Sequence, residues 1–201
     1  MKWFIIKEDL IMANNANLVT AGKPKVGGAV FTAPLGTSLP TSAVTALDES
    51  VWTGLGYISD SGVVNSNSPS NTSIKAWGGD TVLDIQTEKP DTWKMTLIEH
   101  TNKDVLKFIY GDGNVTGSLE TGIVVQANSN ELTTKSMIID MILKNGTAKR
   151  VVLPNCKVTS VSDVNYTDSD AVGYEVEISA YPDSNGNTHY EYIIAQATPT
   201  M

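Results

Sequence analysis

Residues 173–181 read GYEVEISAY, and apolar and polar side chains alternate along the whole stretch. Successive side chains of a β-strand point to opposite faces, so this pattern predicts a strand with one buried face and one wet face. The buried face takes Tyr174, Val176, Ile178 and Ala180, and the wet face takes Glu175, Glu177 and Ser179. A chain with many such stretches has to fold as packed sheets.

Similar patterns predict about eight or nine strands in all. Residues 81–88 and 93–99 are predicted to pair as a hairpin, with one face of each strand toward the core. Asn145-Gly146 predicts a two-residue hairpin turn. The strand before that turn, residues 136–144, is apolar on both sides and is therefore predicted to be buried on both faces. The remaining stretches are residues 50–59 (ended by a turn at 60–62), 121–128, 150–153, 156–162 and 189–195.

The stretch from Thr101 to Gly113 is the one place where apolar side chains have helical spacing. Thr101 is predicted to cap the first turn, and Gly111 and Gly113 to stop the last one. We therefore predict a mainly β fold, a β-sandwich or β-barrel with one flanking α-helix. The apolar stripe of that helix consists of Val105, Leu106, Phe108 and Ile109.

The length of 201 residues suffices for one sizeable core, and we predict a single domain over residues 13–201. Residues 1–12 are interpreted as an N-terminal extension, with translation starting at Met1 or Met12. The single cysteine, Cys156, excludes an internal disulfide framework and indicates a reducing cytosol. No apolar run is long enough to cross a membrane.

The net charge is −8, and Arg150 is the only arginine. Proteins that hold phosphates tightly use several arginine side chains within a positive field. Tight nucleic-acid binding is therefore not expected of this chain.

Two segments look unlike core. Residues 13–47 are rich in Ala, Asn, Thr, Gly and Pro, which predicts an arm ordered by packing on another surface. A plain flexible N-terminus is the alternative. Residues 63–80 are predicted to project as a loop with Trp77 at its base, because the tract NSNSPSNTS (65–73) has no side chain that anchors a core. That loop either docks against another surface or is a mobile surface loop.

The sequence gives little support for a catalytic site or a metal site. Glu175 and Glu177 have the separation of a glycosidase pair, but adjacent residues on one wet face lack the distinct environments that such enzymes need. The stretch from Asp112 begins like a calcium loop and has Ile123 where a bidentate glutamate is required. Two histidines and one cysteine are too few for a typical zinc site. We predict no enzyme activity, no cofactor and no metal.

Three stretches, taken together and in order, resemble siphophage major tail proteins, the tail tube proteins. These are residues 52–63 (WTGLGYISDSGV), 96–113 (TLIEHTNKDVLKFIYGDG) and 150–194. The resemblance implies a tail-tube-like β-barrel or sandwich with a flanking helix. It also implies a structural virion protein whose hexameric rings stack into the tube through which DNA is ejected. The implied partners are other copies of the chain, a tape measure protein, and tail terminator and distal tail proteins, with assembly in the host cytoplasm.

On this reading, double-stranded DNA passes through an acidic lumen without specific binding. Exposed sheet edges become sites for pairing with neighbouring subunits. The candidate lumen-facing residues are Asp84, Gln86, Glu88, Glu175 and Glu177. The candidate ring-stacking loop carries Asn65, Asn67, Ser70, Asn71, Ile74 and Trp77.

The alternative function is a β-sandwich binding or adhesin module of a phage or bacterial surface. Such modules usually cluster exposed aromatic side chains to stack on sugars. Here Trp52, Trp77 and Trp93 fall within strand or loop-base patterns, which favours packing.

Overall fold

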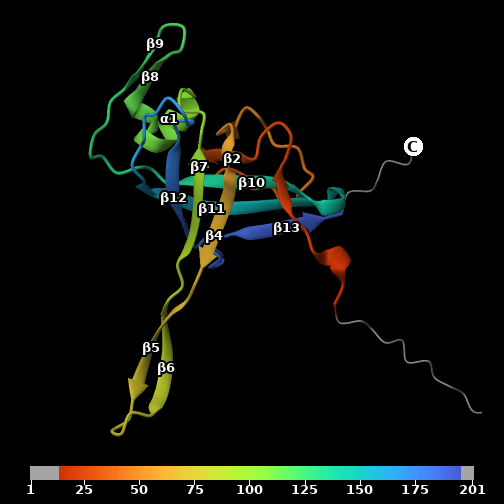
Figure 1. Ribbon diagram of the computed structural model, residues 1–201, viewed down its shortest axis with the longest axis vertical. Helices are drawn as coiled ribbons and strands as arrows, with labels where there is room; N and C mark the ends of the chain where they lie inside the picture. The colour runs from red at the N-terminus through yellow and green to blue at the C-terminus, as the bar shows by residue number, and fades with distance from the viewer. Residues whose placement is uncertain (1–13, 196–201) are drawn as a thin grey trace, which may run out of the picture.

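The fold is built on two long antiparallel strands, β10 (Lys135–Leu143) and β11 (Ala148–Val161). The computed structural model describes residues 14–195, so the predicted extension at residues 1–12 lies outside them (Figure 1). The turn between β10 and β11 includes η3 (Lys144–Gly146), where Asn145 and Gly146 have φ of 64° and 74°. A hairpin turn lies at the predicted position, but it is not the predicted two-residue turn. Ile142 pairs with Ala148 and the Leu143 amide donates to the Thr147 carbonyl at 2.7 Å, so three residues, 144–146, connect the strands.

The main sheet is antiparallel and open. Its order is β3-β2-β10-β11-β12-β7-β4, with β1 beside β10 and β13 beside β11. The predicted mainly β fold with one α-helix is confirmed, and it is sandwich-like because the sheet does not close into a barrel. The bounds are β1 Gly22–Pro24, β2 Val30–Pro34, β3 Thr53–Gly54, β4 Ile58–Asn67, β7 Asp91–Leu97, β12 Tyr174–Tyr181 and β13 Tyr190–Ile194.

Two smaller sheets complete the structure: β5 (Ser70–Lys75) with β6 (Thr81–Glu88), and β8 (Val115–Ser118) with β9 (Gly122–Val125). The described residues thus form 13 strands, more than the eight or nine predicted. The difference comes from short strands such as β1 and β3, which contain too few residues to show a period of two.

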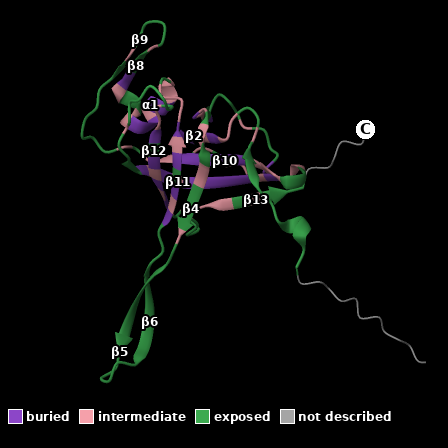
Figure 2. Ribbon diagram, in the orientation of Figure 1, coloured by how far each residue is buried: buried purple, intermediate pink, exposed green. Residues whose placement is uncertain are grey.

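The α-helix α1 (Lys103–Tyr110) packs its predicted apolar stripe into the main core, beside β8, β9 and β11 (Figure 2). Asn102, not Thr101, caps it: the Asn102 side chain accepts a hydrogen bond of 2.9 Å from the Asp104 amide. The helix stops at Gly111, whose φ is 98°. Two short 3-10 turns, η1 (Ala16–Leu18) and η2 (Asp112–Asn114), lie outside the core.

A second apolar cluster covers the other face of β10 and β11, with Trp52, Ile138 and Val152 at its centre. The two clusters together explain why residues 136–144 are apolar on both sides, and the predicted burial on both faces is confirmed for Ser136 to Asp140. The segment between β2 and β3 lies over this second face and supplies Leu39 and Leu47.

A buried ion pair ties that segment to the sheet. Arg150 donates to both oxygens of Asp140, at 2.6 and 2.7 Å, and both side chains are almost fully buried. The same guanidinium donates to the carbonyls of Ser42 and Thr45, each at 2.9 Å. Breaking one partner of such a pair leaves a buried, unpaired charge, so Arg150 serves folding within the chain.

The predicted arm, residues 13–47, is only in part separate from the body. Residues 30–34 form β2, which pairs with β10 and β3, and Val30, Thr32 and Ala33 are buried. Within the predicted arm, the sequence VGGAVF at residues 26–31 is the one strand-like cluster, and its last two residues begin this core strand. Residues 14–20 are exposed and lead away from the body (Figure 1).

Candidate functional site

A long two-stranded ribbon leaves the body of the molecule (Figure 1). β4 and β7 form its base within the main sheet, and β5 and β6 form its projecting part. Pro69 lies between β4 and β5 and Pro90 lies between β6 and β7, at the junction, and proline has no N–H to give to a ladder. The predicted pairing of residues 81–88 with 93–99 is therefore wrong, because β6 pairs with β5. The turn expected at 60–62 is instead an irregularity within β4.

The tip of the ribbon is the turn from Ala76 to Asp80. The Ala76 amide donates to the Asp80 carbonyl at 2.8 Å, and Gly78 and Gly79 have φ of 115° and 101°. Trp77 lies within this turn and is fully exposed, at 107% of its reference area. The prediction that Trp77 lies at the base of a loop is wrong: it lies at the far end of the projection.

The projecting hairpin, residues 70–88, has one apolar and one polar face. The register places Thr72 opposite Ile85 and Ile74 opposite Leu83, which makes the apolar face. All residues of β5 and β6 are exposed, so within the described chain this apolar face packs against nothing. The predicted orientation of Leu83 and Ile85 toward the core is wrong. The polar face pairs Asn71 with Gln86 and Ser73 with Asp84, and Ser73 donates to Asp84 at 3.0 Å.

The candidate stacking residues are thereby spread along the whole ribbon. Asn65 and Asn67 lie in β4 at the base, Ser70, Asn71 and Ile74 lie in β5, and Trp77 lies at the tip. Asp84, Gln86 and Glu88 lie in β6, far from the main sheet that carries Glu175 and Glu177.

The base of the ribbon is held by Asp91, a buried carboxylate at the start of β7. It accepts hydrogen bonds from Asn65 at 2.7 Å, from Thr188 at 2.6 Å and from His189 at 2.5 Å. Burial raises the pKa of Asp91, but the hydrogen bonds from Thr188, His189 and Asn65 outweigh it and hold the pKa below its ordinary value. The cluster joins the ribbon to the segment before β13 and fixes the angle at which the hairpin leaves. Sequence reasoning missed it, because Thr188 and His189 are 97 and 98 residues from Asp91.

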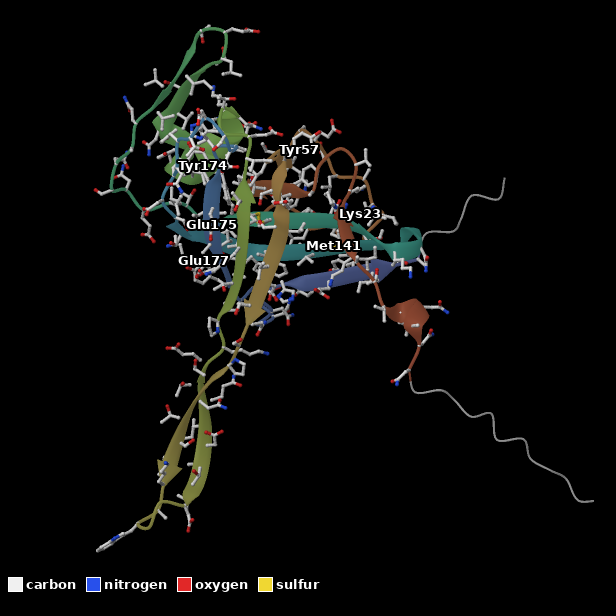
Figure 3. All side chains as sticks on the ribbon, in the orientation of Figure 1. Lys23, Tyr57, Met141, Tyr174, Glu175 and Glu177 are labelled. Carbon is white, nitrogen blue, oxygen red and sulfur yellow. The ribbon has the colours of Figure 1, made fainter. Side chains whose placement is uncertain are left out.

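The wet face of β12 carries Glu175 and Glu177 as predicted from the alternation (Figure 3). Glu177 forms an ion pair of 2.8 Å with Lys94 of β7, and this hydrogen bond raises the pKa of Lys94. Glu175 is exposed and has no ion pair among residues 14–195. The two carboxylates thus lie on an open polar sheet face, and neither of the two grooves described for this chain includes them.

The geometry of residues 14–195 supports neither a reactive cysteine nor a metal site. Cys156 is buried, and burial raises the pKa of its thiol to about 12, so it is unreactive at neutral pH. Within residues 14–195, His, Cys, Asp and Glu side chains do not gather into a metal-binding group of three or more. The helices in that range are all too short to cross a membrane.

A family model described as phage tail tube protein matches residues 12–201. This range is essentially the whole chain and includes the ribbon, the polar face of β12 and the helix. No curated protein matches the sequence.

The Asp91 cluster predicts how the protein responds to acid. A carboxylate whose pKa is lower in the folded than in the unfolded state contributes stability above the unfolded value of about 3.8, and loses it as pH falls through the folded value. Asp91→Asn should lower the free energy of unfolding at pH 7 by about 1–3 kcal/mol. The free energy of unfolding of this variant should also fall less steeply than that of the unsubstituted protein as the pH drops below 4. Urea unfolding at pH 7 and pH 3 measures both, with the exposed Asp168→Asn as the matched control. Equal stability of the two variants at pH 7 would contradict the role assigned to Asp91.

Proposed function

The chain belongs to the phage tail tube protein family, and on this premise we propose that six copies form a ring and that rings stack into the conduit for DNA ejection. As a member of the family it is a structural component of the phage tail. The observation that carries the proposal is the projecting hairpin, whose apolar face has no partner among the described residues. An exposed apolar surface of this kind marks an interaction site.

Ring formation is proposed to use the open edges of the main sheet. β4 pairs only with β7 and β13 only with β11 among the described residues, so each has a row of free backbone groups on its other side. Free edges invite pairing with another chain, which is a liability for a monomer and a means of assembly for a ring subunit. On β4 the candidate edge is residues 64–67, because residues 58–63 line a separate groove, and β13 offers its five residues.

Ring stacking is proposed to use the hairpin. Ile74, Leu83 and Ile85 are each about half exposed. Burying the exposed half of one of these side chains would contribute roughly 1 kcal/mol. The sum of about 3 kcal/mol is below the 4 kcal/mol or more that association of two molecules costs. One hairpin therefore cannot hold two free subunits together. Several hairpins acting at once between preformed rings can, which makes ring formation precede tube growth.

The lumen is proposed to be lined by the polar face of β12 and its neighbours. Glu177 is neutralised by Lys94, so Glu175 supplies the uncompensated negative charge of that strand. Arg150, the only arginine, is buried and bound to Asp140, so the chain presents no guanidinium to a phosphate. A face of this composition allows DNA to slide past without being held. Asp84, Gln86 and Glu88 share one face of β6 and would join the lumen where the hairpin lies along the bore.

The remaining proposed partners are those of a tail: a tape measure protein in the lumen, and terminator and distal tail proteins at the ends. We propose assembly in the host cytoplasm and a purely structural role, without catalysis. The adhesin alternative gains no support from the aromatic residues. Trp52 and Trp93 are buried, and Trp77 stands alone at the tip.

Substitutions on opposite faces of the hairpin test the stacking proposal. Ile85→Lys places a positive charge on the apolar face of the hairpin. Gln86→Lys, at the next residue, places the same charge on the polar face. Both variants should fold with unchanged urea midpoints, because both residues are exposed in the subunit. Ile85→Lys should abolish long tubes in negative-stain microscopy, and Gln86→Lys should retain them. Tubes of normal length from Ile85→Lys would show that the apolar face is not a stacking contact.

Reversing charge on β12 tests the lumen assignment. Tubes of Glu175→Arg/Glu177→Arg assembled with a short DNA duplex should retain DNA that resists nuclease and is released by salt, because arginine binds phosphates. Glu49→Arg/Glu120→Arg changes the net charge equally at exposed positions away from β12. Its tubes should retain no protected DNA. Equal amounts of nuclease-resistant DNA in the tubes of both variants, or none in either, would refute this placement of the lumen.

A further inference from the structure

A groove of about 940 Å³ runs between two segments of the body. One wall is the chain from Gly22 to Ala29, and the other is the chain from Gly56 to Val63 at the start of β4. Lys23, Tyr57 and Met141 lie around it in Figure 3. Neither the proposed lumen face nor the stacking hairpin contributes to its lining.

Glycines keep the groove open. At Gly27 and Gly62 a Cβ atom would meet nothing within 4 Å, so both backbones face empty space. At Gly56 a Cβ would collide with the carboxylate of Glu99, which accepts the Tyr57 amide at 2.9 Å and fixes this wall. The rim carries two large exposed apolar side chains, Val26 at 97% and Tyr57 at 76% exposure. Exposed apolar side chains beside an open groove favour an apolar occupant.

The hairpin tip matches the groove in shape and charge. Trp77 is a large flat apolar side chain, and Gly78 and Gly79 beside it present no side chain that would obstruct insertion. The tip is flanked by Lys75 on one side and Asp80 on the other, and the groove is lined by Asp60 and Lys23. None of these four charged groups forms an ion pair among the described residues, so each is free to pair with its opposite across a contact.

The groove and the tip of the hairpin lie at opposite ends of β4. The groove includes its first residues, and the ribbon continues from its last residue to the tip (Figures 1 and 3). A tip therefore cannot reach the groove of its own chain. A contact between two different patches at opposite ends is heterologous, and repeating it produces an open stack.

We infer that Trp77 at the hairpin tip of one subunit inserts into the groove between residues 22–29 and 56–63 of a subunit in the next ring. This inference rests on the proposed stacking function and adds the site that receives the hairpin. The indole of Trp77 packs against the rim side chains Val26 and Tyr57. Asp80 forms an ion pair with Lys23, and Lys75 forms one with Asp60. The anchor is a single tryptophan, a residue type that is enriched in the energetic hot spots of interfaces.

Cross-linking between two variants, each with one cysteine added to the native Cys156, tests the contact. Ala76→Cys places a thiol beside Trp77, and Ser61→Cys places one in the groove. Cys156 does not interfere, because its thiol is buried and has a pKa raised to about 12. The two variants are mixed, assembled into tubes and treated with a short bis-maleimide linker. Thr116→Cys on β8 replaces Ser61→Cys in the control, since that exposed position lies outside the groove.

The expected result is a cross-linked dimer of the tip and groove variants, in tubes only, at least about tenfold above the control pair. Docking raises the local thiol concentration into the millimolar range. In a Trp3→Phe background, Trp77→Phe should also remove a blue shift in tryptophan emission on assembly, because the two other tryptophans, Trp52 and Trp93, are already buried. Tubes without the specific cross-link would overturn the groove assignment and leave the stacking proposal standing. Failure of the unsubstituted chain to form rings or tubes would overturn the proposed function itself.

Discussion

A two-stranded ribbon cannot bury its own apolar face, and this constraint organises the molecule. β4 and β7 gain a core because they lie in the main sheet, whereas β5 and β6 continue the same ribbon with both faces in solvent. An isolated hairpin is at best marginally stable in water. The chain therefore has two parts: a body that packs its own core, and a projection whose apolar face we propose another subunit covers.

The body holds that projection at a defined angle. The carboxylate of Asp91 gathers donors from β4 and from the segment before β13 at the point where the ribbon leaves the sheet. Pro69 and Pro90 interrupt the ladder just beyond it. The only arginine is used inside the body, where it fixes the covering segment to β10 and β11, so its guanidinium is not available to a phosphate. Both features are consistent with the conduit that we propose.

Local patterns in the sequence predicted the parts of the fold that local chemistry decides. Alternation identified β12, the Asn-Gly pair identified the turn after β10, and residues apolar on both sides identified the doubly covered strand. Pairing partners were not predictable in this way. The Asn- and Ser-rich residues 65–73 have low strand propensity, yet most of them lie in β4 and β5 because β6 and β7 provide partners. Asp91 was missed because its donors are distant in sequence. The start of β2 was recognised as strand-like but assigned to an arm, because glycine and proline surround it.

Hydrogen exchange of the amides in residues 70–88 tests the central claim most directly. In unassembled subunits these amides should exchange fast compared with those of β10 and β11, because the hairpin lacks a core of its own. In assembled tubes they should become protected, as a neighbouring subunit covers the apolar face. Strong protection of the hairpin in the isolated subunit, or no gain of protection on assembly, would contradict the account.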